Sequence, residues 1–242
     1  MTPQTPQDRL IFALDVPDLD RAVDHIKTLG DSVGCFKVGL ELFIRAGVDA
    51  IRAVRDHSDA AVFLDLKLHD IPVTVERAVT AAREHGVQFL TVHCGGGEAM
   101  VQAALKAAGG TTQILGVTVL TSMTGRDLDP AWGYSDGLTV HELVMDRVLM
   151  GRDLGLTGFV CSGEEVEDIK KQSGGPLLTV VPGIRLADGT VTGDDQSRIT
   201  TPTDAIQRGA DYLVVGRPIR DAKDPQDAAR RIVDEIAHAL KA

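Results

Sequence analysis

Acidic and basic residues lie at the ends of three neighbouring apolar runs in this chain. Asp15 follows the first run, Lys37 lies near the end of the second, and Asp65 and Lys67 close the third. Side chains on a strand alternate between faces, so Asp65 and Lys67 are predicted to point the same way. Charges are costly to bury, so such a group usually needs a reason beyond stability. An ammonium beside a carboxylate is suited to stabilising negative charge and delivering a proton.

A second group is basic and lies near the end of the chain. Gly216 and Arg217 follow the apolar run 212–215, and Arg185 follows the run 177–181. Backbone N–H groups and an arginine fork at such a position favour an anion, and a phosphate is the anion most often bound there in barrels of strands and helices. The glycine-rich segment 186–200 between them has the length of a lid that closes on a ligand; a passive surface loop is the alternative.

The elements that must position these groups are read from the apolar pattern. Eight short apolar runs alternate with eight helical segments, and one helix is predicted over residues 40–55. The pattern favours an α/β fold, a single-domain (β/α)8 TIM barrel over residues 9–242 after an N-terminal extension of residues 1–8. An open doubly wound sheet is the alternative. In a barrel, the carboxyl ends of the strands share one face, which would bring the charged residues together.

Composition excludes several classes of protein. The net charge of −10 argues against nucleic-acid binding, and 4% aromatic residues leave little for base stacking. The chain contains no run near the ~20 apolar residues of a membrane span and no signal-peptide core, so a cytoplasmic protein is expected. Cys35, Cys94 and Cys161 are far apart, so neither disulfides nor a zinc site is expected. His93 beside Cys94 lacks a further ligand at metal-binding spacing and is interpreted as structural.

The third run continues into a longer motif. Asp65-Leu66-Lys67-Leu68-His69-Asp70-Ile71-Pro72 resembles the DxKxxDIP signature of the orotidine 5′-phosphate decarboxylase family. Between Leu10 and Ile219, further segments match that family in order: Ala13-Leu14-Asp15, Phe36-Lys37-Val38-Gly39, Val119-Leu120-Thr121-Ser122-Met123, Pro182-Gly183-Ile184-Arg185 and Val215-Gly216-Arg217-Pro218.

The resemblance implies a homodimeric barrel that converts orotidine 5′-phosphate to UMP and CO2 with no metal and no organic cofactor. It implies that Lys67 is the proton donor, that Asp65 lies against the substrate carboxylate, and that Lys37 and Asp70 complete a network of alternating charge. The remaining implied site residues are Asp15 and Lys37 at the ribose, Thr121 and Ser122 near the pyrimidine, Asp70, Ile71 and Thr74 in the partner subunit's site, and Arg185, Gln196, Gly216 and Arg217 at the phosphate.

Two other functions fit part of the pattern. A 3-keto-hexulonate-phosphate decarboxylase or hexulose-phosphate synthase has a similar acid and lysine on strand 3, but it binds Mg²⁺ through an acid at the end of strand 2. In this sequence that position is Lys37, a cation that would repel the metal. A non-catalytic barrel that binds a phosphorylated ligand would need the arginines but not the Asp65–Lys67 pair.

Overall fold

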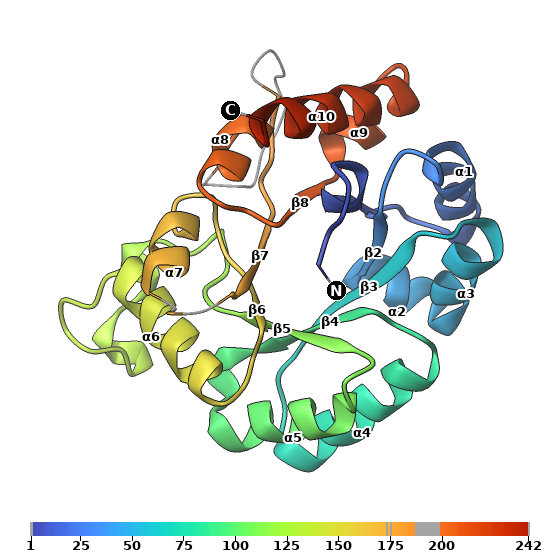
Figure 1. Cartoon of the computed structure of the whole chain (residues 1–242). Coiled ribbons are helices and arrows are strands. Elements are labelled where there is room, and N and C mark those ends of the chain that lie inside the picture. The colour runs from blue at the N-terminus through green and yellow to red at the C-terminus, as the bar shows by residue number, and fades with distance from the viewer. Residues whose placement is uncertain (1, 173, 175, 187–198, 242) are drawn as a thin grey trace.

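The apolar runs form eight parallel strands that close into a barrel surrounded by helices (Figure 1). The computed structural model describes residues 2–172, 174, 176–186 and 199–241. Each strand pairs with its neighbours in sequence, and β8 pairs with β1 to close the ring. The predicted TIM barrel is confirmed, and the open-sheet alternative is wrong. The strands are β1 (Leu10–Ala13), β2 (Cys35–Gly39), β3 (Ala61–Leu68), β4 (Phe89–His93), β5 (Gln113–Val117), β6 (Gly158–Val160), β7 (Leu178–Val181) and β8 (Tyr212–Val215).

Helices connect the strands and begin where the sequence supplies capping groups. Asp18 accepts a hydrogen bond from the Arg21 N–H at 2.8 Å at the start of the first helix, and Thr139 and Glu142 form a capping box before the sixth. The helices are α1 (Leu19–Leu29), α2 (Leu40–Ala46), α3 (Val48–His57), α4 (Pro72–Glu84), α5 (Glu98–Ala108), α6 (Val140–Asp153), α7 (Val166–Gln172), α8 (Pro202–Gln207), α9 (Arg217–Arg220) and α10 (Pro225–Ala239), with short 3₁₀ turns η1 (Gln7–Arg9), η2 (Cys94–Gly96), η3 (Gly125–Asp127) and η4 (Pro130–Trp132).

The segment after β2 forms two helices, so the single helix predicted over residues 40–55 is wrong. α2 ends at Ala46 and α3 begins at Val48. Gly47 between them has a φ of 56°, which is outside the helical region and which glycine adopts without steric cost. The chain therefore turns at Gly47 although the apolar pattern continues through it.

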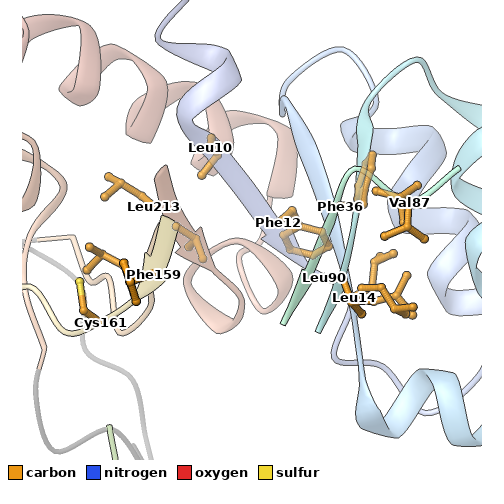
Figure 2. Packing of buried hydrophobic residues seen from close by; sticks show 14 of the residues in the cluster. Leu10, Phe12, Leu14, Phe36, Val87, Leu90, Phe159, Cys161 and Leu213 are labelled. Carbon is orange, nitrogen blue, oxygen red and sulfur yellow. The ribbon is translucent and has the colours of Figure 1, made fainter. Parts of the chain in front are cut away.

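Two apolar layers stabilise the barrel. Inside the ring, Phe89 packs edge-on against Phe63 and Tyr212, with ring centroids 6.1 and 5.3 Å apart. Between the strands and the helices lies a second and larger layer, which includes Phe12 and Leu213 (Figure 2). The inner layer fills the barrel below its carboxyl face, so the space for a ligand lies at that face.

Several large apolar side chains remain on the surface next to the carboxyl face. Ile44 and Leu40 on α2 and Ile71 and Val73 around the start of α4 are all exposed, Ile44 by 80% and Ile71 by 63%. Within the described residues, no helix is long and apolar enough to cross a bilayer.

Candidate active site

Four charged side chains meet at the carboxyl ends of β1, β2 and β3. Lys67 Nζ lies 2.9 Å from each carboxylate oxygen of Asp65. Lys37 Nζ lies 3.6 Å from Asp65 Oδ2 and 3.2 Å from Asp15 Oδ1. The charges therefore alternate in the order Asp15, Lys37, Asp65, Lys67, and the structure brings together the four residues that the sequence placed at neighbouring strand ends.

The middle pair of this network is buried and charged. Lys37 and Asp65 are each only 9% exposed. Burial opposes the charge on Lys37, but attraction to Asp65 and then to Asp15 outweighs it and raises the lysine pKa above its usual value. Burial also opposes the charge on Asp65, but attraction to Lys37 and then to Lys67 outweighs it and holds the carboxyl pKa below its usual value. Both groups are therefore ionised at neutral pH.

Lys67 reaches the site through an irregularity in β3. Leu64 pairs with Leu90 and Leu68 pairs with Val92, so three residues of β3 lie opposite a single residue of β4. Lys67 lies within this bulge with a φ of 50°, the left-handed region that residues other than glycine rarely adopt. The predicted shared orientation of Asp65 and Lys67 is observed, but a regular alternating strand does not produce it.

Thr91 on β4 is the single residue opposite the bulge. Its hydroxyl accepts a hydrogen bond from the Lys67 N–H at 2.9 Å and donates one to Asp65 Oδ1 at 2.9 Å. Its side chain is completely buried. Thr91 is not predicted as a site residue from the sequence, since a threonine within an apolar strand is ordinary and gives no chemical signal.

The charged network forms one wall of a cavity of about 550 Å³ at the carboxyl face. Apolar side chains of β5, β6 and β8, among them Val117, Val160 and Val214, form much of the rest of the lining, and Thr121 and Ser122 lie on its rim after β5. The cavity therefore offers a charged side and an apolar side, as an amphipathic ring system requires.

Arginines line the side of the same cavity that is formed by the ends of β7 and β8. Arg185 and Arg217 both line it together with Gly216, as the sequence predicted. Arg185 is 9% exposed, and its guanidinium donates to the Ile184 carbonyl at 2.8 Å. Arg220 on α9 also lines the cavity, and it donates to the backbone carbonyl of Asp15 at 2.8 Å. This third arginine was missed because it lies one helical turn beyond the recognised motif.

Some predicted residues are not brought into this cavity. Asp70, Ile71 and Thr74 are exposed beside it and are absent from the set of described residues that line it. Asp70 instead accepts a hydrogen bond from the Ile71 N–H at 2.6 Å. Gln196 and most of the predicted lid, residues 187–198, lie outside the described residues.

Two further groups lie close to the charged network. A Cβ on Gly39 would lie 3.0 Å from both Asp15 Oδ1 and Lys37 Nζ, so only glycine leaves these groups their present positions. At the end of β4, His93 packs against His69 with ring centroids 5.2 Å apart. Burial, followed by electrostatic interaction with His69, Lys67 and Arg147, lowers the His93 pKa to about 4, so this imidazole is neutral at pH 7. No three His, Cys, Asp or Glu side chains among the described residues group as metal ligands.

Fold and site together define a class. A (β/α)8 barrel with an acid–base network on β1 to β3, and with arginines after β7 and β8, is an enzyme-type barrel built to hold a phosphorylated small molecule. Comparison with known proteins agrees. Residues 8–232 match the model of the orotidine 5′-phosphate decarboxylase / HUMPS family, and the chain belongs to that family.

The relatives are similar over nearly their whole length. The orotidine 5′-phosphate decarboxylase of Desulfosudis oleivorans is 48% identical over 98% of this chain and 96% of its own. The orotidine 5′-phosphate decarboxylase of a Bradyrhizobium species is 48% identical over 97% of this chain and 94% of its own. Among solved structures, the orotidine 5′-phosphate decarboxylase of Lactobacillus acidophilus superposes with a TM-score of 0.80 at 35% identity, covering 94% of this chain and 98% of the other.

Proposed function

We propose that this chain is a carboxy-lyase that converts orotidine 5′-phosphate to UMP and CO2, the last step of de novo pyrimidine biosynthesis. The observation that carries the proposal is the contact of Lys67 Nζ with both oxygens of Asp65, 2.9 Å each, in a cavity that also holds Arg185 and Arg217. A proton donor, a fixed negative charge and a phosphate site thus share one enclosure. Three free, buried cysteines suit a reducing, cytoplasmic location.

The chemistry explains why such a network is needed. Loss of CO2 from C6 of the pyrimidine leaves a vinyl carbanion with no good electron sink. The Lys67 ammonium stabilises the developing charge at C6 and then protonates that carbon. Metal ions and organic cofactors are not required, since a preorganised ammonium supplies both the positive charge and the proton.

Asp65 contributes by position. Its carboxylate would lie beside the substrate carboxylate, and two like charges about 4 Å apart at an intermediate dielectric repel by about 4 kcal/mol. This repulsion disappears as CO2 leaves. Asp65 also keeps the ammonium of Lys67 in place, and Lys37 does the same for Asp65 from the other side.

The rest of the substrate is held away from the reacting carbon. Binding free energy from the phosphate and ribose can be used to position the pyrimidine in the transition state. Asp15 and Lys37 bind the ribose, Thr121 and Ser122 lie near the pyrimidine, and Arg185, Gln196, Gly216 and Arg217 bind the phosphate.

A homodimer completes the site. Asp70, Ile71 and Thr74 are exposed, and so are the large apolar side chains of Leu40, Ile44 and Val73. A partner subunit that covers these side chains would bring its own Asp70, Ile71 and Thr74 to the open side of the network. That contact would add another carboxylate to the alternating charges.

The direct test is to follow the absorbance of orotidine 5′-phosphate after adding the purified protein. Wild-type protein is expected to consume it and release UMP. Lys67→Ala is expected to remain folded with no measurable turnover, whereas Lys106→Ala, which removes an exposed lysine of α5, is expected to be as active as wild type. Near-normal turnover by Lys67→Ala would refute the assignment of the proton donor.

Chelation separates this function from the Mg²⁺-dependent alternative. The position at the end of β2 that would have to hold the metal is Lys37, which forms ion pairs with Asp15 and Asp65. We therefore expect full decarboxylase activity after treatment with EDTA. Activity that is lost on chelation and restored by Mg²⁺ would favour a hexulose-phosphate enzyme, and binding of UMP without any turnover would favour a non-catalytic barrel.

A further inference from the structure

We infer that Thr91 is a positioning residue for the reaction: its hydroxyl holds the bulge of β3 in the one conformation that places Lys67 and Asp65 together. The inference rests on the proposed decarboxylase function for its kinetic test. It concerns a residue that touches neither the cavity nor the substrate and that acts only through the two groups above it.

The first support is the register of the strands. Between the pairs Leu64–Leu90 and Leu68–Val92, the backbone of β3 has no regular ladder partners on β4, and Thr91 is the residue that faces this gap. The Lys67 N–H, which the bulge removes from the ladder, donates to Thr91 Oγ1 at 2.9 Å. A buried N–H without a partner is costly, so the threonine hydroxyl takes the place of the missing backbone acceptor.

The second support is the direction of the remaining hydrogen bond. Having accepted from Lys67, the same hydroxyl uses its proton to donate to Asp65 Oδ1 at 2.9 Å. One hydroxyl therefore fixes both the backbone of Lys67 and the carboxylate of Asp65. Asp65 in turn contacts Lys67 Nζ through both oxygens. The Lys67 side chain is therefore held at its backbone end by Thr91 and at its ammonium end by Asp65.

The third support is the backbone of Lys67 itself. Its left-handed φ of 50° is unfavourable for a lysine and persists only where surrounding contacts impose it. The hydrogen bond to the completely buried Thr91 acts on the backbone of that same residue. Without it, we expect the bulge to relax toward an ordinary strand and the ammonium to move away from the reacting carbon.

The main test replaces Thr91 with valine, which has the same shape but can neither accept nor donate. Thr91→Val is expected to lower kcat by roughly 10- to 100-fold, as a displacement of about 1 Å in a catalytic group does. The KM for orotidine 5′-phosphate and the Kd for UMP are expected to change little, since the arginines that bind phosphate lie after β7 and β8. Thr91→Ser keeps the hydroxyl and should restore kcat to near the wild-type value.

The matched control is Thr179→Val, which removes a completely buried threonine hydroxyl from β7. That hydroxyl lies within hydrogen-bond distance of two acceptors, Asp211 Oδ2 at 3.3 Å and the Gly209 carbonyl at 3.4 Å. The kcat of this variant is expected to equal that of wild type even where its thermal stability falls. A wild-type kcat for Thr91→Val, or an equal loss in kcat and in UMP affinity, would overturn the inference.

A comparison of two other Thr91 variants and a crystal structure of one variant also test the role of Thr91. If Thr91→Val does not fold, Thr91→Ser and Thr91→Cys are compared, because they differ in one atom and only the hydroxyl is a strong hydrogen-bonding group; equal kcat values would overturn the inference. A crystal structure of a folded variant that lacks the hydroxyl, Thr91→Val or Thr91→Cys, is expected to show a changed Lys67 φ, and an unchanged bulge would also overturn it. The structural measurement needs no turnover, so failure of wild type to decarboxylate orotidine 5′-phosphate would refute the proposed function separately.

Discussion

At the scale of single residues, Lys37 joins the two acids of the site. Its Nζ lies 3.2 Å from Asp15 and 3.6 Å from Asp65. Asp65 has a lowered pKa in the folded protein, so its contribution to stability is present above pH 3.8 and is lost as pH falls through the lower, folded value. Lys37 has a raised pKa, so its contribution is present below pH 10.5 and is lost as pH rises through the higher, folded value. The network stays charged between these limits.

Replacing Lys37 tests this coupling. Lys37→Met removes the largest attraction that keeps Asp65 ionised against its burial, so the Asp65 pKa is expected to rise. The acidic limb of the kcat/KM–pH profile should move to higher pH by the same amount, and KM should rise because a proposed ribose ligand is lost. Lys27→Met, on the exposed side of α1, should leave the profile unchanged. An acidic limb that does not move would show that Asp65 does not depend on Lys37.

At the scale of elements, the sequence predicts the strands but not their irregularities. Each of the eight strands is an apolar run, and their order closes the barrel without further information. The bulge of β3 was not predictable, because it depends on Thr91 of another strand rather than on the local sequence of β3. The break at Gly47 was missed for a related reason: glycine within an amphipathic pattern is tolerated in many helices, and only the backbone φ shows that this one ends a helix.

Packing between the elements gives a prediction at this scale. A Cβ on Gly116 of β5 would lie 2.8 Å from the Cys94 sulfur and 2.9 Å from both Leu156 and Phe159. Gly116→Ala is therefore expected to lower the free energy of unfolding by about 1–3 kcal/mol through overpacking, measured by urea denaturation.

Gly125→Ala provides the control for that experiment. No described atom lies within 4 Å of the Cβ that it would add. Its free energy of unfolding is expected to stay within about 0.5 kcal/mol of the wild-type value. Equal stability of the two variants would mean that the contact between β5 and its covering residues is loose.

At the scale of the whole molecule, some of the predicted site residues lie inside the cavity of one barrel and others lie exposed on its surface. Asp15, Lys37, Asp65 and Lys67 are assembled within one chain, and sequence order alone predicted their meeting. The role of Asp70 could not be judged in the same way, because the residue is exposed and is absent from the described residues that line the cavity. The role of such a residue is predicted from a motif and is tested by combining variant subunits.

Mixing two inactive variants tests whether Asp70 acts in the partner subunit's site. If Asp70 completes the partner subunit's site, as proposed, one site in a heterodimer of Lys67→Ala and Asp70→Ala subunits carries both changes and the other carries neither. Random exchange of subunits is therefore expected to restore about a quarter of wild-type activity from two preparations that are each nearly inactive. The controls are each variant mixed with itself. Failure to recover activity after proven subunit exchange would place Lys67 and Asp70 of the same chain in one site.

The left-handed backbone of Lys67 has a meaning for how this sequence was selected. Every other described residue with a positive φ is a glycine, the residue that adopts this region without steric cost. A side chain there costs on the order of 1–2 kcal/mol. Selection for a stable fold alone would favour glycine at position 67. A lysine at this position lowers the stability of the fold and is explained by its role in the proposed reaction. The backbone conformation of one residue therefore indicates a compromise between stability and activity.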